Sequence, residues 1–115
     1  MSLITYREAI AIAMRDALKK NPSSLVYGLC VTDHTGLFGT TLGLEAEFGA
    51  DRVFETPLSE DAMTGFAVGA ALNGLYPIHI HLRNDFLLLS MNQLVNSIAK
   101  YKYMYGGCFE IPMLV

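Results

Sequence analysis

The chain has 115 residues, of which 52% are hydrophobic and only 17% are charged. This length fits one compact domain, and the apolar content excludes a disordered chain. The net charge of −3 comes from 8 basic and 11 acidic residues, without the basic stripe of a nucleic-acid-binding protein. The two cysteines, Cys30 and Cys108, are far apart, so neither a disulfide framework nor a cysteine zinc site is predicted.

The spacing of apolar residues predicts helices and strands in alternation. Thr5 and Glu8 have the spacing of a capping box, and the amphipathic helix that they open ends at residues 21–23. Strands are expected at residues 25–31, 53–56, 77–82 and 111–115, and further helices at 41–48, 59–73 and 84–105. This alternation predicts a three-layer α/β/α fold with a mostly parallel sheet. The apolar ending predicts a truncated domain, either a fragment or a piece of a larger assembly.

No apolar run is long enough to cross a membrane, and the first residues lack the features of a secretory signal. A reducing, cytoplasmic compartment is therefore expected. The predicted helix at 84–105 is apolar almost all the way round, which is typical of a helix buried on more than one side. Because so short a chain cannot bury it alone, we expect the helix Asn84–Tyr105 to pack against a second subunit in an oligomer.

Glu60 is the first candidate functional residue, and two interpretations stay open for it. It follows Ser59 and opens a predicted helix, where acidic side chains favour the first turn and Ser59 is a typical N-cap. On that interpretation Glu60 only stabilises the helix. Glu60 also follows a predicted strand, and ligands of α/β sheets bind at the carboxyl ends of strands. A carboxylate there, beside apolar Leu58 and Met63, can exchange protons with a ligand.

Two other patterns carry weaker functional signals. Gly65 and Gly69 have GxxxG spacing, which indicates close helix packing, and no phosphate-binding glycine loop occurs. His79 and His81 alternate on one predicted strand, so both side chains project to the same face. A metal site needs at least one more ligand, and none is evident in the sequence. We therefore predict no metal site, and expect a hydrogen-bonded, partly buried histidine pair.

Several segments, taken in order, resemble one known family. They are Ile4–Ala9, Phe48–Val53, Thr56–Glu60, Gly65–Leu72, Gly74–Pro77, Asp85-Phe86, Asn92–Asn96 and Gly106-Gly107. Together they resemble the β subunit of the thiamine-diphosphate-dependent 2-oxo acid dehydrogenase E1 component, shared by pyruvate, branched-chain and acetoin dehydrogenases. The resemblance covers nearly the whole chain. It implies that residues 1–115 are the N-terminal part of a transketolase-like pyrimidine-binding domain.

The resemblance also implies roles for four residues. Glu60 matches the family glutamate that hydrogen-bonds N1′ of the cofactor's aminopyrimidine and so promotes proton removal from the thiazolium ring. Phe86 matches the aromatic side chain that stacks on the pyrimidine, and Leu58 and Leu82 match positions that line its pocket. The cofactor carries the carbanion chemistry, while the protein supplies orientation and one acid.

The partners implied by the resemblance lie outside this chain. Magnesium and the diphosphate would be bound mainly by an E1 α-type subunit, so the isolated chain is expected to be inactive. A lipoyl-bearing E2 acyltransferase would accept the acyl group after oxidative decarboxylation of a 2-oxo acid. Two alternatives stay open, namely another transketolase-like enzyme, such as a transketolase or deoxyxylulose-phosphate synthase, and a non-catalytic assembly subunit. Leu29, Cys30 and Asn92 depart from the family pattern, which has acidic residues at these places.

Overall fold

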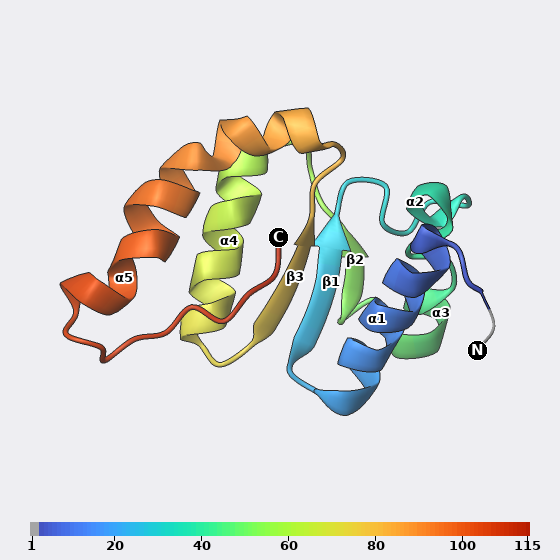
Figure 1. Ribbon diagram of the computed structural model, residues 1–115, viewed down its shortest axis with the longest axis horizontal. Helices are drawn as coiled ribbons and strands as arrows, with labels where there is room; N and C mark the ends of the chain where they lie inside the picture. The colour runs from blue at the N-terminus through green and yellow to red at the C-terminus, as the bar shows by residue number, and fades with distance from the viewer. Residues whose placement is uncertain (1–2) are drawn as a thin grey trace.

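The computed structural model describes residues 3–115 of the chain. Its central sheet has three parallel strands in the order β2-β1-β3, with β1 at Ser24–Gly28, β2 at Val53–Glu55 and β3 at Tyr76–Ile80. All three strands run in the same direction in Figure 1. Their carboxyl ends therefore meet at one edge of the sheet, where the expected site residues follow.

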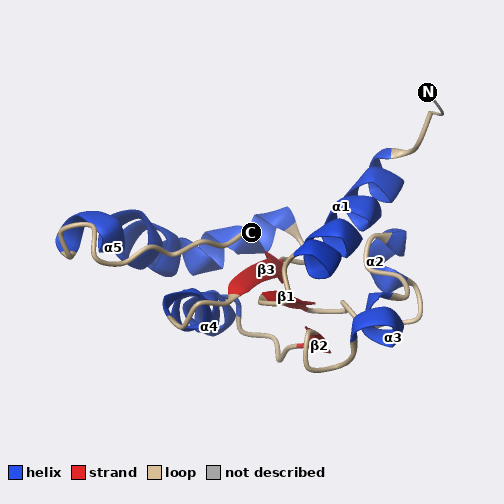
Figure 2. Ribbon diagram, turned by 90° about the horizontal axis from the view of Figure 1, so that it is seen from below, coloured by secondary structure: helices blue, strands red, loops and turns tan. Residues whose placement is uncertain are grey.

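Helices lie on both sides of this sheet (Figure 2). One side carries α1 (Tyr6–Lys20), α2 (Gly36–Gly39) and α3 (Leu44–Phe48), and the other carries α4 (Glu60–Leu72). A further helical segment consists of η1 (Asn84–Ser90), η2 (Gln93–Ile98) and α5 (Ala99–Met104), and its first two parts pack against α4. The α/β/α fold with a parallel sheet, expected from the sequence, is therefore confirmed.

The first helix begins where its local sequence predicts. The Thr5 hydroxyl accepts a hydrogen bond from the Glu8 backbone N–H at 3.4 Å, and the Glu8 carboxylate accepts one from the Thr5 backbone N–H at 2.7 Å. This reciprocal pair is the capping box, and it satisfies two backbone donors that a helix start leaves free. Met14 and Leu18 then bury the inner face of α1 against the sheet.

Alternation along the strands creates two apolar cores. Val26 lies opposite Val53 and Ile78 in the sheet, and these side chains pack with α1 and α3. The next residue, Tyr27, points to the α4 side, where its hydroxyl donates to the Met63 carbonyl oxygen at 3.0 Å. Because side chains alternate between the faces of a strand, every second residue belongs to the α4 core. This periodicity places His79, the sheet partner of Tyr27, in that core.

Several details of the predicted elements differ from the structure. β1 ends at Gly28 instead of residue 31, and the helix expected at 41–48 begins only at Leu44. The predicted final strand is wrong, since only Leu114 pairs with the sheet, in a parallel bridge to Ile78. Ser59 occupies the N-cap position of α4, but its side chain makes no capping hydrogen bond.

The predicted helix Asn84–Tyr105 is helical but irregular. η1 is a 3₁₀ helix and η2 is a π-helix, and only α5 has regular α-helical bonding. Two polar contacts accompany this irregularity. The buried Ser90 hydroxyl lies 2.9 Å from the Thr64 hydroxyl, and the Gln93 amide donates to the Asp61 carboxylate at 3.2 Å. Both contacts join the irregular segment to α4.

Gly28 is the last residue of β1, at a point where this strand lies very close to β3. A Cβ atom at this position would lie 2.2 Å from the carbonyl oxygen of Ile80, a distance that requires backbone movement. We expect Gly28→Ala to lower the free energy of unfolding by about 1–3 kcal/mol, the usual cost of overpacking. Urea denaturation measures this value. The control is Gly69→Ala in α4, where a Cβ meets nothing within 4 Å, and this change should stabilise the protein by up to about 1 kcal/mol.

Candidate functional site

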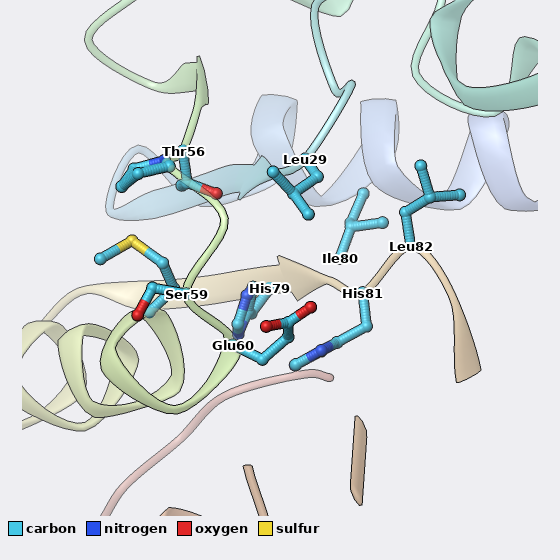
Figure 3. Close-up of a pocket in the computed structure, with 10 residues that line it drawn as sticks. Leu29, Thr56, Ser59, Glu60, His79, Ile80, His81 and Leu82 are labelled. Atoms are coloured by element: carbon cyan, nitrogen blue, oxygen red, sulfur yellow. The ribbon is translucent and has the colours of Figure 1, made fainter. Parts of the chain in front are cut away.

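A small pocket lies at the carboxyl ends of the three strands, where α4 begins (Figure 3). Its lining combines residues that follow each strand with the first turn of α4. They are Leu29, Thr56, Pro57, Ser59, Glu60, Met63, His79, Ile80, His81 and Leu82. Parallel α/β sheets bind ligands at this edge, because the loops that leave the strands there frame a crevice.

Glu60 is the only acidic residue in the lining of this pocket. It is the first residue of α4 and is half-buried. Figure 3 shows its carboxylate directed between the side chains of His79 and His81. Within residues 3–115 no hydrogen bond or ion pair occupies this carboxylate, whereas the nearby Asp61 carboxylate is bonded to Gln93. The helix dipole still favours an acid here, but the Glu60 carboxylate is free to bind a ligand or exchange a proton.

The Thr64 hydroxyl connects the two histidines behind Glu60. Its oxygen lies 3.4 Å from Nδ1 of His79 and 3.4 Å from Nε2 of His81. The same hydroxyl is 2.8 Å from the backbone carbonyl oxygen of Glu60, and 2.9 Å from the Ser90 hydroxyl. The histidine rings are 4.2 Å apart and tilted, so they contact each other and share Thr64 as a partner. The predicted hydrogen-bonded histidine pair is thus a pair joined through Thr64.

Burial favours the neutral form of both imidazoles. His79 is 4% exposed and stacks on Tyr27, and burial, with a smaller contribution from His81, lowers the pKa of His79 to about 4. Burial also lowers the pKa of His81, and the nearby Glu60 carboxylate opposes this effect. At neutral pH both rings beside the Glu60 carboxyl group are therefore uncharged.

The structure brings two of the four expected site residues into one pocket. Glu60 and Leu82 line it, with Leu29 as an additional apolar wall. Leu58 and Phe86 lie outside the lining, with exposed fractions of 74% and 42%. The Arg83 guanidinium lies 6.0 Å from the centre of the Phe86 ring. Leu58 and Phe86 are thus part of the outer surface.

Sequence reasoning missed Thr64 as a member of the site. The available signal was a hydroxyl on a helix face that packs against the sheet, and such a group is expected to find a buried partner. Among residues 3–115, no three His, Cys, Asp or Glu side chains gather as a metal-binding group. No helix in the same part of the chain is long and apolar enough to cross a membrane.

Comparisons with known proteins agree with this geometry. Residues 2–115 match the family described as "Transketolase, pyrimidine binding domain". The chain is 39% identical over 114 residues to the pyruvate dehydrogenase E1 component subunit beta of Rhizobium meliloti, covering 99% of this chain and 25% of that protein. It is 35% identical over 115 residues to the 2-oxoisovalerate dehydrogenase subunit beta of Bacillus subtilis, covering 100% of this chain and 35% of the relative.

A third relative, the pyruvate dehydrogenase E1 component subunit beta of Acholeplasma laidlawii, is 37% identical over 115 residues, which are 100% of this chain and 35% of that protein. The chain therefore spans about a quarter to a third of the length of these relatives. The match nevertheless includes every strand of the sheet and all residues around the pocket. The chain belongs to the transketolase pyrimidine-binding domain family and resembles the β subunits of 2-oxo acid dehydrogenases.

Proposed function

We propose that this chain is the pyrimidine-binding part of a thiamine-diphosphate-dependent 2-oxo acid dehydrogenase E1 β-type subunit. The observation that carries the proposal is the Glu60 carboxylate, which has no hydrogen-bond partner within residues 3–115 and lies in a pocket at the carboxyl ends of the strands. The β-subunit relatives support the reaction class. The complete enzyme would catalyse oxidative decarboxylation of a 2-oxo acid.

The side chains around the pocket fit an aminopyrimidine in their chemistry. Glu60 supplies an acid that can hold a proton at a ring nitrogen, and Leu29 and Leu82 supply apolar walls. In the sequence, Leu58 follows β2 and Phe86 follows β3, and residues at the ends of both strands line this pocket. We propose that Leu58 and Phe86 cover the ring once a partner subunit packs there. Their present exposure leaves them available for that contact.

The pocket does not fit the other end of the cofactor. No Lys or Arg is among its lining residues, so it offers no cation for a diphosphate. We therefore propose that an E1 α-type subunit binds the diphosphate and its magnesium ion, and that this chain alone is catalytically inactive. When bound, thiamine diphosphate supplies the carbanion chemistry of decarboxylation. This chain's contribution is to orient the pyrimidine, exclude water and hold a proton at Glu60.

One further partner and a cellular location belong to the proposal. A lipoyl-bearing E2 acyltransferase would take the acyl group from the E1 enzyme. A cytoplasmic location is consistent with Cys30 and Cys108, which are both free thiols in the structure.

Calorimetric titration tests the proposed function. Thiamine diphosphate with magnesium is titrated into the chain alone and into its mixture with a candidate α-type subunit. We expect weak or undetectable binding to the chain alone and clear binding to the mixture, because the two ends of the cofactor would be held by different subunits. Absence of binding to a stable complex of both subunits contradicts the proposal and favours a non-catalytic assembly subunit.

The segment from η1 to α5 is proposed as the surface for self-association. Its outer face carries large exposed apolar side chains, namely Leu88, Leu89, Met91, Val95, Tyr103 and Met104. Many large exposed apolar side chains in one segment are typical of an interface between subunits.

Light scattering measures this self-association. We expect wild-type protein to form a dimer or larger oligomer, and the double variant Leu88→Glu, Val95→Glu to shift the mass toward the monomer. Ile12→Glu is the matched control, because Ile12 is 49% exposed on α1, away from this segment. A wild-type protein that stays monomeric at high concentration contradicts this prediction.

A further inference from the structure

Glu60 and His81 each bring a polar group without a partner within residues 3–115 to this pocket. One is the Glu60 carboxylate. The other is Nδ1 of His81, which is buried and makes no hydrogen bond. A buried polar atom without a partner lowers stability, so it is retained only where another interaction or a function offsets that cost. Both residues line the same pocket, and the Glu60 carboxylate acts electrostatically on the His81 ring.

The proton positions around Thr64 determine which nitrogen of His81 is free to accept. The Thr64 hydroxyl has one proton, and the Glu60 carbonyl oxygen, 2.8 Å away, can only accept. If the proton is given to that carbonyl, a hydrogen bond between His81 and Thr64 needs Nε2 as the donor, and His79 and Ser90 compete for the same Thr64 oxygen. In the neutral ring Nδ1 then carries the lone pair. Thr64 thus holds His81 with its acceptor nitrogen free.

We propose that His81 is a positioning residue for Glu60, whose Nδ1 accepts a hydrogen bond from the protonated Glu60 carboxyl group, so that the two side chains hold one proton between them. The transfer moves a proton from the carboxyl oxygen to Nδ1 and back, and no other group changes. The hydrogen bond is not formed in this structure. No other hydrogen bond of the Glu60 carboxylate within residues 3–115 has to break for it to form.

Few other groups act on this pair. From α4, Glu60 and Thr64 face His81, from β3 its neighbour is His79, and from η1 the Ser90 hydroxyl reaches Thr64. The pKa of His79 is about 4, so His79 is uncharged at neutral pH. Glu60 is the charged group that raises the pKa of His81 against the effect of burial. The pKa of His81 therefore responds to the charge of Glu60 as well as to burial, which has the larger effect.

The inference relies on the proposed function for the ligand that Glu60 serves, but the pair itself can be observed without a ligand. Nuclear magnetic resonance of the 115-residue chain follows the ring nitrogens of His81 and the carboxyl carbon of Glu60 as the pH changes. The variants are Glu60→Gln, which keeps shape but removes the charge, and Asp61→Asn. Asp61 is the matched control, because it is an acid of the same helical turn that bonds Gln93.

We expect a neutral His81 ring with the proton on Nε2, and a Glu60 carboxyl signal that moves together with the His81 titration. Glu60→Gln should lower the pKa of His81 further, and Asp61→Asn should leave it near the wild-type value. A second pair of variants tests the role of Thr64. Thr64→Ser should keep the Nε2–H form, whereas Thr64→Val should populate both forms of the neutral ring.

Two results overturn the inference. One is a His81 pKa that does not respond to Glu60→Gln, and the other is a wild-type ring with its proton on Nδ1. Because no ligand is present, either failure is distinct from a failure of thiamine diphosphate to bind. Conversely, a coupled pair in a chain that binds no cofactor with any α-type subunit would leave this inference standing and remove the proposed function.

Discussion

Glu60→Gln is expected to lower the turnover of the assembled enzyme by about 10² to 10⁴, the usual contribution of a general acid–base group. Glutamine has nearly the same shape, so it still reaches the ligand and fills the pocket. It cannot hold or deliver the proton. Steady-state turnover per folded active site, measured in the complex with the α-type subunit, gives the effect.

The alternative interpretation of Glu60 makes a different prediction for the same variant. If Glu60 only complements the α4 dipole, Glu60→Gln costs at most about 1 kcal/mol of stability and leaves turnover unchanged. Asp61→Asn is the control for the dipole, since it removes one charge from the same turn. A lower melting temperature with wild-type turnover for Glu60→Gln would contradict the site assignment. A loss of turnover without a change in melting temperature would exclude the capping interpretation.

The structure removes the Ser59 part of the capping interpretation and leaves the dipole part to this experiment. An N-cap interaction needs a side-chain oxygen that accepts from the free backbone N–H groups of the first turn. Ser59 makes no such bond, and the Glu60 carboxylate points into the pocket (Figure 3). The first turn of α4 is instead held by the Asp61–Gln93 contact and by burial of Thr64.

The sequence predicted those parts of the fold that depend on neighbouring residues. The capping box of Thr5 and Glu8 acts over three positions, and the alternation of Val26 and Tyr27 follows from strand geometry. The position of Glu60 at the carboxyl end of β2 also followed from the order of elements. In each case the deciding contact is local, or is imposed by the periodicity of one element.

Long-range contacts explain what the sequence did not predict. The 3₁₀ and π segments coincide with Ser90 and Gln93, whose partners Thr64 and Asp61 are distant in the chain. The free Nδ1 of His81 depends in the same way on Thr64, which occupies the other nitrogen. A pattern of apolar residues marks which face of α4 is buried, but it does not show which hydroxyl there meets which ring.

Acidification between pH 7 and about pH 4.5 is expected to lower the stability of the domain by roughly 2–3 kcal/mol through His79. The pKa of His79 is about 4 in the folded protein, against an ordinary value of 6.5. Between these values the unfolded chain binds a proton that the folded protein does not, so stability falls as the pH falls. Since small domains have about 5–15 kcal/mol in total, this loss is large.

In this pH range the effect of His79 on stability can be distinguished from the effects of the carboxyl groups. The pKa values of Glu8, Asp33, Glu47 and Glu110 are lowered by hydrogen bonds and nearby charges, so their stabilising effect is lost only at more acidic pH. His81 contributes with the same sign as His79, because burial lowers its pKa as well. A second variant is therefore needed to assign the effect to one ring.

His79→Phe is that variant, because phenylalanine can stack on Tyr27 and does not titrate. Urea denaturation at pH 7 and pH 4.5 should show the full pH-dependent loss of stability in the wild type. In His79→Phe only the smaller loss caused by His81 should remain. His34→Gln, in an exposed loop, is the control and should behave as the wild type. Equal losses of stability in the wild type and in His79→Phe would contradict this prediction. They would show that the pKa of the His79 ring, stacked on Tyr27 and joined to Thr64, is not lowered by its burial.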